Sequence, residues 1–246
     1  MALLSTLKPE SKHTVLVYGD SGNGKTVFAT SFPSPMKVFD FDGKIMSAVS
    51  YWGQKDATRL TQIDVEDLQS MNAHPEQYSK FYTLLSQLES QAKAGNFPWK
   101  TVVLDSLTTW CDALMREIVR QNPGIKGAAP GLPGLQHYGL FGSKFREQLS
   151  RLLALPCNVV VTAHIDVTKD ENTGEILRRP LVIGKNASYL PIIFGEVYRA
   201  FAETKDGKTE YWAQTQASGS WIARSQIPGL APKIPLTYQS LVNNKN

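Results

Sequence analysis

The chain has 246 residues, of which 42% are hydrophobic and 20% are charged, and its formal net charge is +4. The length suits one large domain, and the composition excludes a wholly disordered chain, a low-complexity polymer and, with only two cysteines, a disulfide framework. The mild positive charge permits binding of a polyanion without requiring it.

Five apolar segments are predicted to be β-strands, and the first four are continuously apolar, as in parallel strands that are covered on both faces. These strands span residues 14–18, 36–41, 101–105, 158–163 and 197–202. Helical patterns span residues 24–32, 75–94, 107–121 and 140–155. This alternation predicts an α/β fold with a mostly parallel central sheet flanked by helices. Two more strand-like segments are expected to extend the sheet with antiparallel strands, at residues 208–215 and 220–224.

Two long segments have no clear helical or strand pattern. Residues 122–139 are rich in glycine and proline, and residues 165–188 are polar. Long segments of this kind inside a compact domain are uncommon and often functional. The alternatives are a surface excursion without a function and, for the second segment, a plain hairpin.

A phosphate-binding loop (P-loop) follows directly after the first predicted strand. The motif G-x-x-x-x-G-K-[ST] is matched by Gly19, Asp20, Ser21, Gly22, Asn23, Gly24, Lys25 and Thr26. In such a loop the backbone N–H groups wrap a β-phosphate, the lysine reaches the β- and γ-phosphates, and the threonine hydroxyl binds Mg²⁺. The motif therefore predicts binding of a nucleoside triphosphate with Mg²⁺.

Acidic residues end two of the predicted strands, at the sheet edge where parallel sheets bind ligands. Asp105 is expected to hold Mg²⁺ together with Thr26, and the alternative is that it only caps the next helix. Because Ser106 rather than Glu follows, the group that orients the attacking water must come from elsewhere. On an extended strand Asp40 and Asp42 would point the same way, and either could orient water. The alternative there is a solvated turn.

His164 follows the strand at residues 158–163. A polar side chain in this place can contact the γ-phosphate and relay its loss to the following loop. The alternative is a structural histidine.

These elements occur in the order of the RecA-like ATPase core, which the chain resembles. The motifs that carry the resemblance are the P-loop, Val-Phe-Asp-Phe-Asp, Val-Val-Leu-Asp-Ser-Leu-Thr and Val-Val-Val-Thr-Ala-His. The chain is more closely similar to the phage-encoded single-strand annealing proteins that consist of this core alone. The resemblance covers residues 13–240, with a short N-terminal segment at 1–12 and a flexible tail at 241–246.

The resemblance implies an ATPase, with ATP and Mg²⁺ as cofactors, whose catalytic residues are Lys25, Asp42, Asp105, His164 and Arg224. Asp42 stands where the family usually carries Glu, one methylene longer, so we expect slow hydrolysis that DNA stimulates. The resemblance also implies a homo-oligomer, a ring or a filament, with ATP between neighbouring subunits. Arg224 would act as a basic finger in the neighbour's site, and Lys185 is a rival for that role.

The two unassigned segments match the family's two DNA-binding loops. Cations beside aromatic rings are typical of surfaces that bind single strands. The candidate contacts to single-stranded DNA are Lys126, His137 and Tyr138 in the first loop, and Lys169, Arg178, Arg179 and Lys185 in the second.

The leading hypothesis is an ATP-switched protein of phage recombination that binds single-stranded DNA and promotes strand annealing or exchange. A single-strand-binding protein is a candidate partner. A cytoplasmic location, in the bacterial host if a phage encodes the protein, is expected, since no signal peptide or membrane span of about 18 residues is visible. Two alternatives stay open: a small-molecule P-loop kinase or nucleotide hydrolase with Arg178 and Arg179 on a lid, and a weakly catalytic loader or scaffold for replication proteins.

Overall fold

An eight-stranded sheet forms the centre of the protein, in the strand order β10-β9-β8-β1-β5-β4-β2-β3. The computed structural model describes residues 12–69, 74, 76–125, 129–169 and 174–243. Six neighbouring strands run parallel, and β9 and β10 extend the sheet in antiparallel fashion. The parallel strands are β1 Thr14–Tyr18, β2 Met36–Asp40, β3 Ile63–Asp67, β4 Thr101–Asp105, β5 Asn158–Ala163 and β8 Glu196–Lys205. The antiparallel strands are β9 Lys208–Gln214 and β10 Lys233–Pro235. The predicted α/β fold is confirmed.

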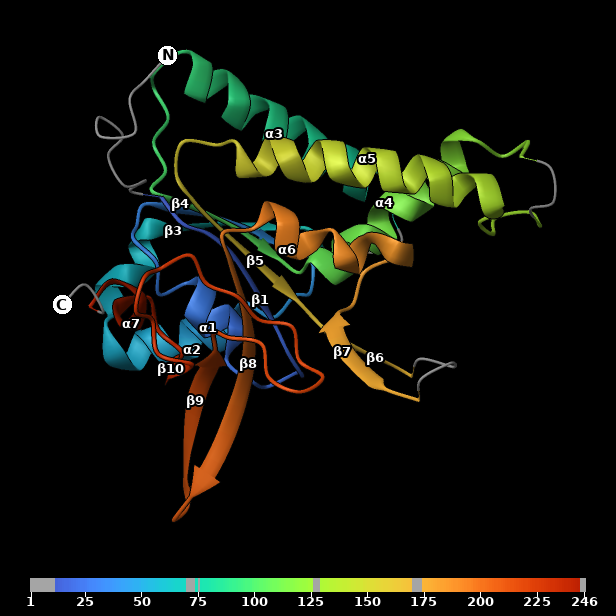
Figure 1. The fold of residues 1–246 in the computed structure, drawn as a ribbon. Helices are drawn as coiled ribbons and strands as arrows, with labels where there is room; N and C mark the ends of the chain where they lie inside the picture. The colour runs from blue at the N-terminus through green and yellow to red at the C-terminus, as the bar shows by residue number, and fades with distance from the viewer. Residues whose placement is uncertain (1–11, 70–73, 75, 126–128, 170–173, 244–246) are drawn as a thin grey trace, which may run out of the picture.

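Helices cover both faces of this sheet (Figure 1). Strands β1, β2, β4 and β5 are therefore buried on both sides. One face carries α3 Gln77–Lys93, α4 Leu107–Gln121, α5 Leu135–Leu153 and α6 Leu190–Ile193. The other face carries α1 Lys25–Ala29, α2 Met46–Lys55 and α7 Tyr238–Val242. Alternate residues of β1 belong to two separate hydrophobic clusters. Leu16 is part of the cluster under α4 and α5, and Val15 is part of the cluster under α1.

The elements with strong local signals lie where the sequence predicts them. Strands β1, β4 and β5 and helix α4 have the predicted bounds. Strand β3 and helix α2 were not predicted. In β3, acidic residues interrupt the apolar ones at the edge of the sheet, so the strand is only half-buried.

The segment at residues 220–224 is not a regular strand, which corrects the prediction. Its described residues make only isolated bridges, from Trp221 to Arg178 and to Ser218, and from Arg224 to Val197. The position next to β9 is taken instead by β10.

The polar segment at 165–188 contains a hairpin, as the plainer interpretation expected. Strands β6 Ile165–Lys169 and β7 Ile176–Pro180 pair in antiparallel fashion, and the short helix η4 Gly184–Ser188 follows. Among the described residues, no helix has the length and apolar character needed to cross a membrane.

Candidate nucleotide-binding site

The P-loop connects β1 to α1 and approaches the neighbouring strands closely. A Cβ atom at position 19 would collide with the carbonyl oxygen of Ala200 in β8. Gly24 has φ +78°, and a Cβ there would lie 3.0 Å from the ring of Tyr211 in β9. Both glycines are therefore required for the loop to lie against β8 and β9.

Lys25 places its ammonium group inside this loop. The side chain is largely buried, and Nζ donates hydrogen bonds to the carbonyl oxygens of Gly19 (2.9 Å) and Asp20 (2.8 Å). Burial lowers the pKa of Lys25, although the nearby Asp105 and Asp42 counteract this effect. A buried cation in a loop of backbone amides is the arrangement that a triphosphate requires.

Asp105 at the end of β4 and Thr26 in α1 bring two side-chain oxygens together. Thr26 Oγ1 donates to Asp105 Oδ2 over 2.7 Å, and the hydroxyl of Thr162 donates to the other carboxylate oxygen. Burial raises the pKa of Asp105, and these two hydrogen bonds oppose the rise. A hydroxyl and a carboxylate fit Mg²⁺, which takes its remaining oxygens from water and phosphates.

Asp40 and Asp42 have different roles, and the expectation that they point the same way is wrong. Strand β2 ends at Asp40, whose carboxylate accepts hydrogen bonds from the backbone N–H groups of Gly43, Lys44 and Ile45. Asp40 therefore holds the turn that leads to α2, and it is not available to orient water.

Asp42 faces the cavity beside the P-loop. Its carboxylate accepts hydrogen bonds from the hydroxyls of Ser106 (2.9 Å) and Thr109, and its Oδ2 lies 2.9 Å from Nε2 of His164. Burial alone would raise the pKa of Asp42, but the hydrogen bonds from His164, Thr109 and Ser106 outweigh burial and lower it. Asp42 is thus held as a carboxylate, the form that can orient or deprotonate water.

His164 connects this carboxylate to the chain beyond the hairpin. Its backbone N–H donates to Thr108 Oγ1 (3.0 Å), and Thr108 donates to the carbonyl oxygen of Leu181 (2.8 Å). The N–H of Leu181 donates back to the carbonyl oxygen of His164 over 2.8 Å. A closed set of hydrogen bonds therefore ties the backbone of His164 to Leu181, the residue that follows β7.

The P-loop, Asp42, Asp105 and His164 line one cavity of about 720 Å³. The sequence profile of the AAA domain family matches residues 11–227, which is most of the chain. The chain belongs to the AAA domain family. The AAA domain is a P-loop ATPase domain that binds nucleotide, and the residues of this cavity fit that assignment.

Among solved structures, the AAA domain is similar to the flagellar accessory protein FlaH from Methanocaldococcus jannaschii. The two sequences are 10% identical, the match covers 90% of this chain and 83% of that chain, and the TM-score is 0.41. No curated protein matches the chain.

Sequence reasoning missed the apolar half of the cavity. Its wall is formed by Tyr51 from α2, Tyr211 and Trp212 from β9, and Pro235 and Leu236 at β10. These residues belong to no phosphate motif, and the only signal was the aromatic pair in a short strand near the C-terminus. The cavity of the AAA domain therefore combines the charged groups of the P-loop and the strand ends with an apolar wall that adjoins the P-loop at Gly24.

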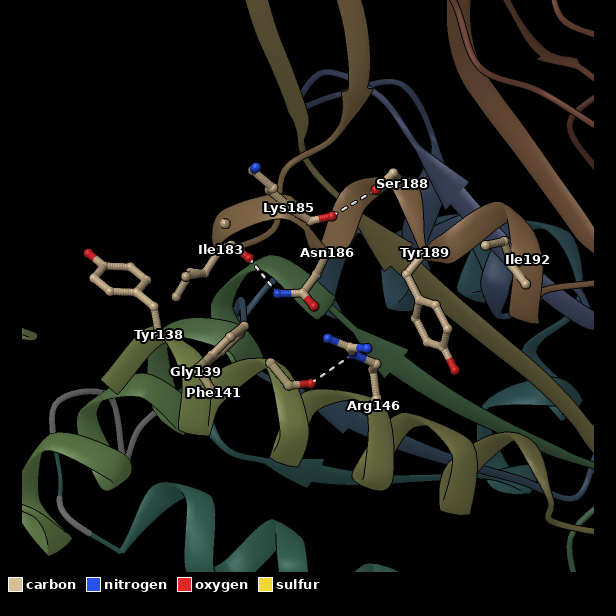
Figure 2. Close-up of a pocket in the computed structure, with 12 residues that line it drawn as sticks. Tyr138, Gly139, Phe141, Arg146, Ile183, Lys185, Asn186, Ser188, Tyr189 and Ile192 are labelled. Atoms are coloured by element: carbon tan, nitrogen blue, oxygen red, sulfur yellow. Dashed lines mark hydrogen bonds between the residues drawn. The ribbon is translucent and has the colours of Figure 1, made fainter. Parts of the chain in front are cut away.

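Two of the residues predicted to contact DNA meet in a second cavity, of about 590 Å³ (Figure 2). Tyr138 comes from the start of α5 and Lys185 from η4, so the two predicted loops converge here. His137, which was also predicted to contact DNA, does not line this cavity. It is fully buried, its Nδ1 accepts a hydrogen bond from the N–H of Gly134, and its Nε2 lies 3.1 Å from the carbonyl oxygen of Asn122. His137 closes the start of α5 and cannot stack on a base, which corrects the prediction.

Three other predicted cations lie outside this second cavity. Lys169 ends β6 and is exposed, and Arg178 and Arg179 lie on β7, where Arg179 pairs with Asp166. Lys126 lies outside the described residues. Arg224 donates from Nη1 to the carbonyl oxygen of Pro191 over 2.6 Å, so within its own chain it is tied to α6.

Proposed function

We propose that this P-loop ATPase binds single-stranded DNA under the control of ATP and acts in phage recombination, by annealing or exchanging strands. The observation that carries the proposal is the hydrogen-bonded connection from Asp42 through His164 to Leu181. Leu181 precedes Lys185, the cation of the second cavity, by four residues. A change at the γ-phosphate can therefore reach the candidate DNA site through one short segment.

The second cavity has the chemistry that a single strand needs. Tyr138 is 46% exposed, and the guanidinium carbon of Arg146 lies 5.6 Å from the centre of the Tyr189 ring. Figure 2 shows Arg146 near Tyr189, Tyr138 at the opposite end of the view, and Lys185 above them on η4. Stacking rings beside cations bind bases and phosphates without strong sequence preference.

ATP acts as the switch in this proposal. With a γ-phosphate present, His164 and Asp42 hold Leu181 and η4 in the arrangement that binds DNA, and loss of the phosphate releases it. Subunits assemble into a ring or filament with ATP between neighbours. Arg224 or Lys185 then reaches the adjacent site, and a single-strand-binding protein delivers the strand.

The test is the affinity for a fluorescently labelled oligonucleotide, measured by anisotropy with a non-hydrolysable ATP analogue, with ADP and without nucleotide. We expect about tenfold tighter binding with the analogue, within the usual range of coupling between sites. His164→Ala should bind the analogue but lose the difference between nucleotide states. Equal affinities in all three states of the wild-type protein would exclude the switch.

The apolar half of the nucleotide cavity is expected to bind the base. Tyr211 lies against the P-loop at Gly24 and is 45% exposed, which suits stacking on a base. Tyr211→Ala should weaken ATP binding about tenfold, whereas Tyr211→Phe should not, because stacking on an aromatic ring contributes roughly 1–3 kcal/mol. Inorganic tripolyphosphate, which has no base, should bind both variants like the wild type. An equal loss of tripolyphosphate binding would show that Tyr211 only supports the P-loop.

The kinase alternative gains no support from the two arginines of its proposed lid. Arg179 pairs with Asp166 across the hairpin, and Arg178 donates to Ser220 Oγ (2.5 Å). Both side chains are held by their own surroundings, whereas a lid needs arginines that swing over the phosphates.

A further inference from the structure

Cations and aromatic rings alternate in a stripe that runs from β7 across β8 and β9 to β10. Each guanidinium carbon or ammonium nitrogen lies over a neighbouring ring. The distances to the ring centres are 5.1 Å for Arg178 over Trp221, 3.5 Å for Arg199 over Trp221, 4.7 Å for Arg199 over Phe201, 5.5 Å for Lys233 over Phe201, and 4.3 Å for Lys233 over Trp212. We call these six residues the cation–aromatic ladder.

The alternation of β8 and its pairing with β9 build this ladder. Tyr198 and Ala200 are buried in the cluster under α1, so Arg199 and Phe201 lie on the opposite face of the strand. Phe201 pairs with Trp212 across the two strands. Beyond the sheet core the β8–β9 hairpin extends away from the helices (Figure 1).

Among the residues that the structure describes, the side-chain hydrogen-bond partners of the two ladder arginines are neutral. Arg178 donates to Ser220 Oγ over 2.5 Å, and Arg199 donates to Gln214 Oε1 over 3.2 Å. Within the described part of the chain, no carboxylate lies at ion-pair distance from either guanidinium. Lys233, at the other end of the ladder, differs from the two arginines because its ammonium group forms an ion pair with Glu203 over 2.5 Å.

Two like charges on one indole ring repel each other, and an anion beside them removes that repulsion. The guanidinium fork matches the oxygens of a phosphate group and forms strong, charge-assisted hydrogen bonds to it. Trp221 and Phe201 hold the guanidinium of Arg199 in a fixed orientation, so little conformational entropy is lost when a phosphate binds.

We propose that Arg178 and Arg199 bind the phosphodiester backbone of a single DNA strand, and that the ladder is a strand-binding surface in addition to the Tyr138–Lys185 cavity. The inference deepens the proposed function and rests on it. Arg199 and Trp221, which carry no motif, become part of the DNA interface. Because the contacts are to phosphates, the ladder binds without base preference.

The test compares Arg178→Gln and Arg199→Gln with Lys205→Gln, by titrating a labelled oligonucleotide at several salt concentrations. Lys205 ends β8 outside the ladder, so its variant removes the same charge elsewhere on the hairpin. Each lost phosphate contact should reduce the steepness of the salt dependence by about 0.7, which weakens binding about fivefold at 0.1 M salt. The loss should be equal for oligo-dT and oligo-dA, and Lys205→Gln should bind like the wild type.

Trp221→Phe provides a second variant that removes no charge. It should weaken DNA binding with the salt dependence unchanged, because it loosens the arginines without removing a phosphate contact. The inference is overturned if both arginine variants keep the wild-type salt dependence while the wild-type protein binds DNA. It is also overturned if they lose ATP hydrolysis without DNA but keep DNA affinity, since the anion would then be a neighbour's nucleotide. Failure of the wild-type protein to bind any strand would instead refute the proposed function itself.

Discussion

Replacing Lys25 with alanine is expected to abolish binding of ATP at micromolar concentrations. The ammonium of Lys25 lies inside the P-loop, within 3 Å of two backbone carbonyl oxygens, and it is the buried cation of the nucleotide cavity. Truncating one partner of a buried, hydrogen-bonded charge pair costs about 2–5 kcal/mol, which is roughly 30-fold to several thousand-fold in affinity. The measurement is isothermal titration of the free protein with ATP and Mg²⁺.

Lys44→Ala is the matched control for this experiment. Lys44 lines the same cavity but lies on the turn before α2 and is exposed, so its charge is screened by solvent. We expect its loss to change ATP affinity less than about threefold. Similar losses in the two variants would mean that net charge rather than P-loop geometry holds the phosphates.

Asp42→Asn is expected to lower ATP turnover by about 100-fold or more, the usual range for loss of a general base. ATP affinity should change little, because Asp42 accepts hydrogen bonds from Ser106, Thr109 and His164 rather than from the P-loop. Single-turnover hydrolysis separates this effect from binding.

Asp42→Glu is the informative companion variant. It keeps the carboxylate and lengthens the side chain by one methylene, to the residue that RecA-like cores usually carry. We expect turnover equal to or above that of the wild-type protein. Wild-type hydrolysis by Asp42→Asn would show that another group orients the water.

The phosphate half of the site could be predicted from the sequence because each part is local. The P-loop consists of consecutive residues. Asp105 ends one apolar strand and His164 directly follows another, and the ends of these parallel strands must meet at one sheet edge. The end of the second strand was predicted less accurately. Since β2 ends at Asp40, the two aspartates that a longer strand would have aligned face different partners.

The remaining features depend on contacts between distant segments, which no local pattern encodes. Tyr211 meets the P-loop only because β9 pairs with β8, and β8 pairs with β1. His137 resembled a surface histidine in a glycine-rich loop, yet α5 begins before it and buries its ring. The ladder likewise forms only when four strands, β7, β8, β9 and β10, and the loop that carries Trp221 have assembled.

The proposed coupling of the nucleotide and DNA sites through His164 must be reciprocal, because any coupling between two binding sites is. The most direct measurement is the affinity of the wild-type protein for a fluorescent, non-hydrolysable ATP analogue with and without a saturating oligonucleotide. We expect DNA to tighten analogue binding by the same factor, about tenfold, by which the analogue tightens DNA binding. Analogue affinity that is identical with and without the oligonucleotide would contradict it.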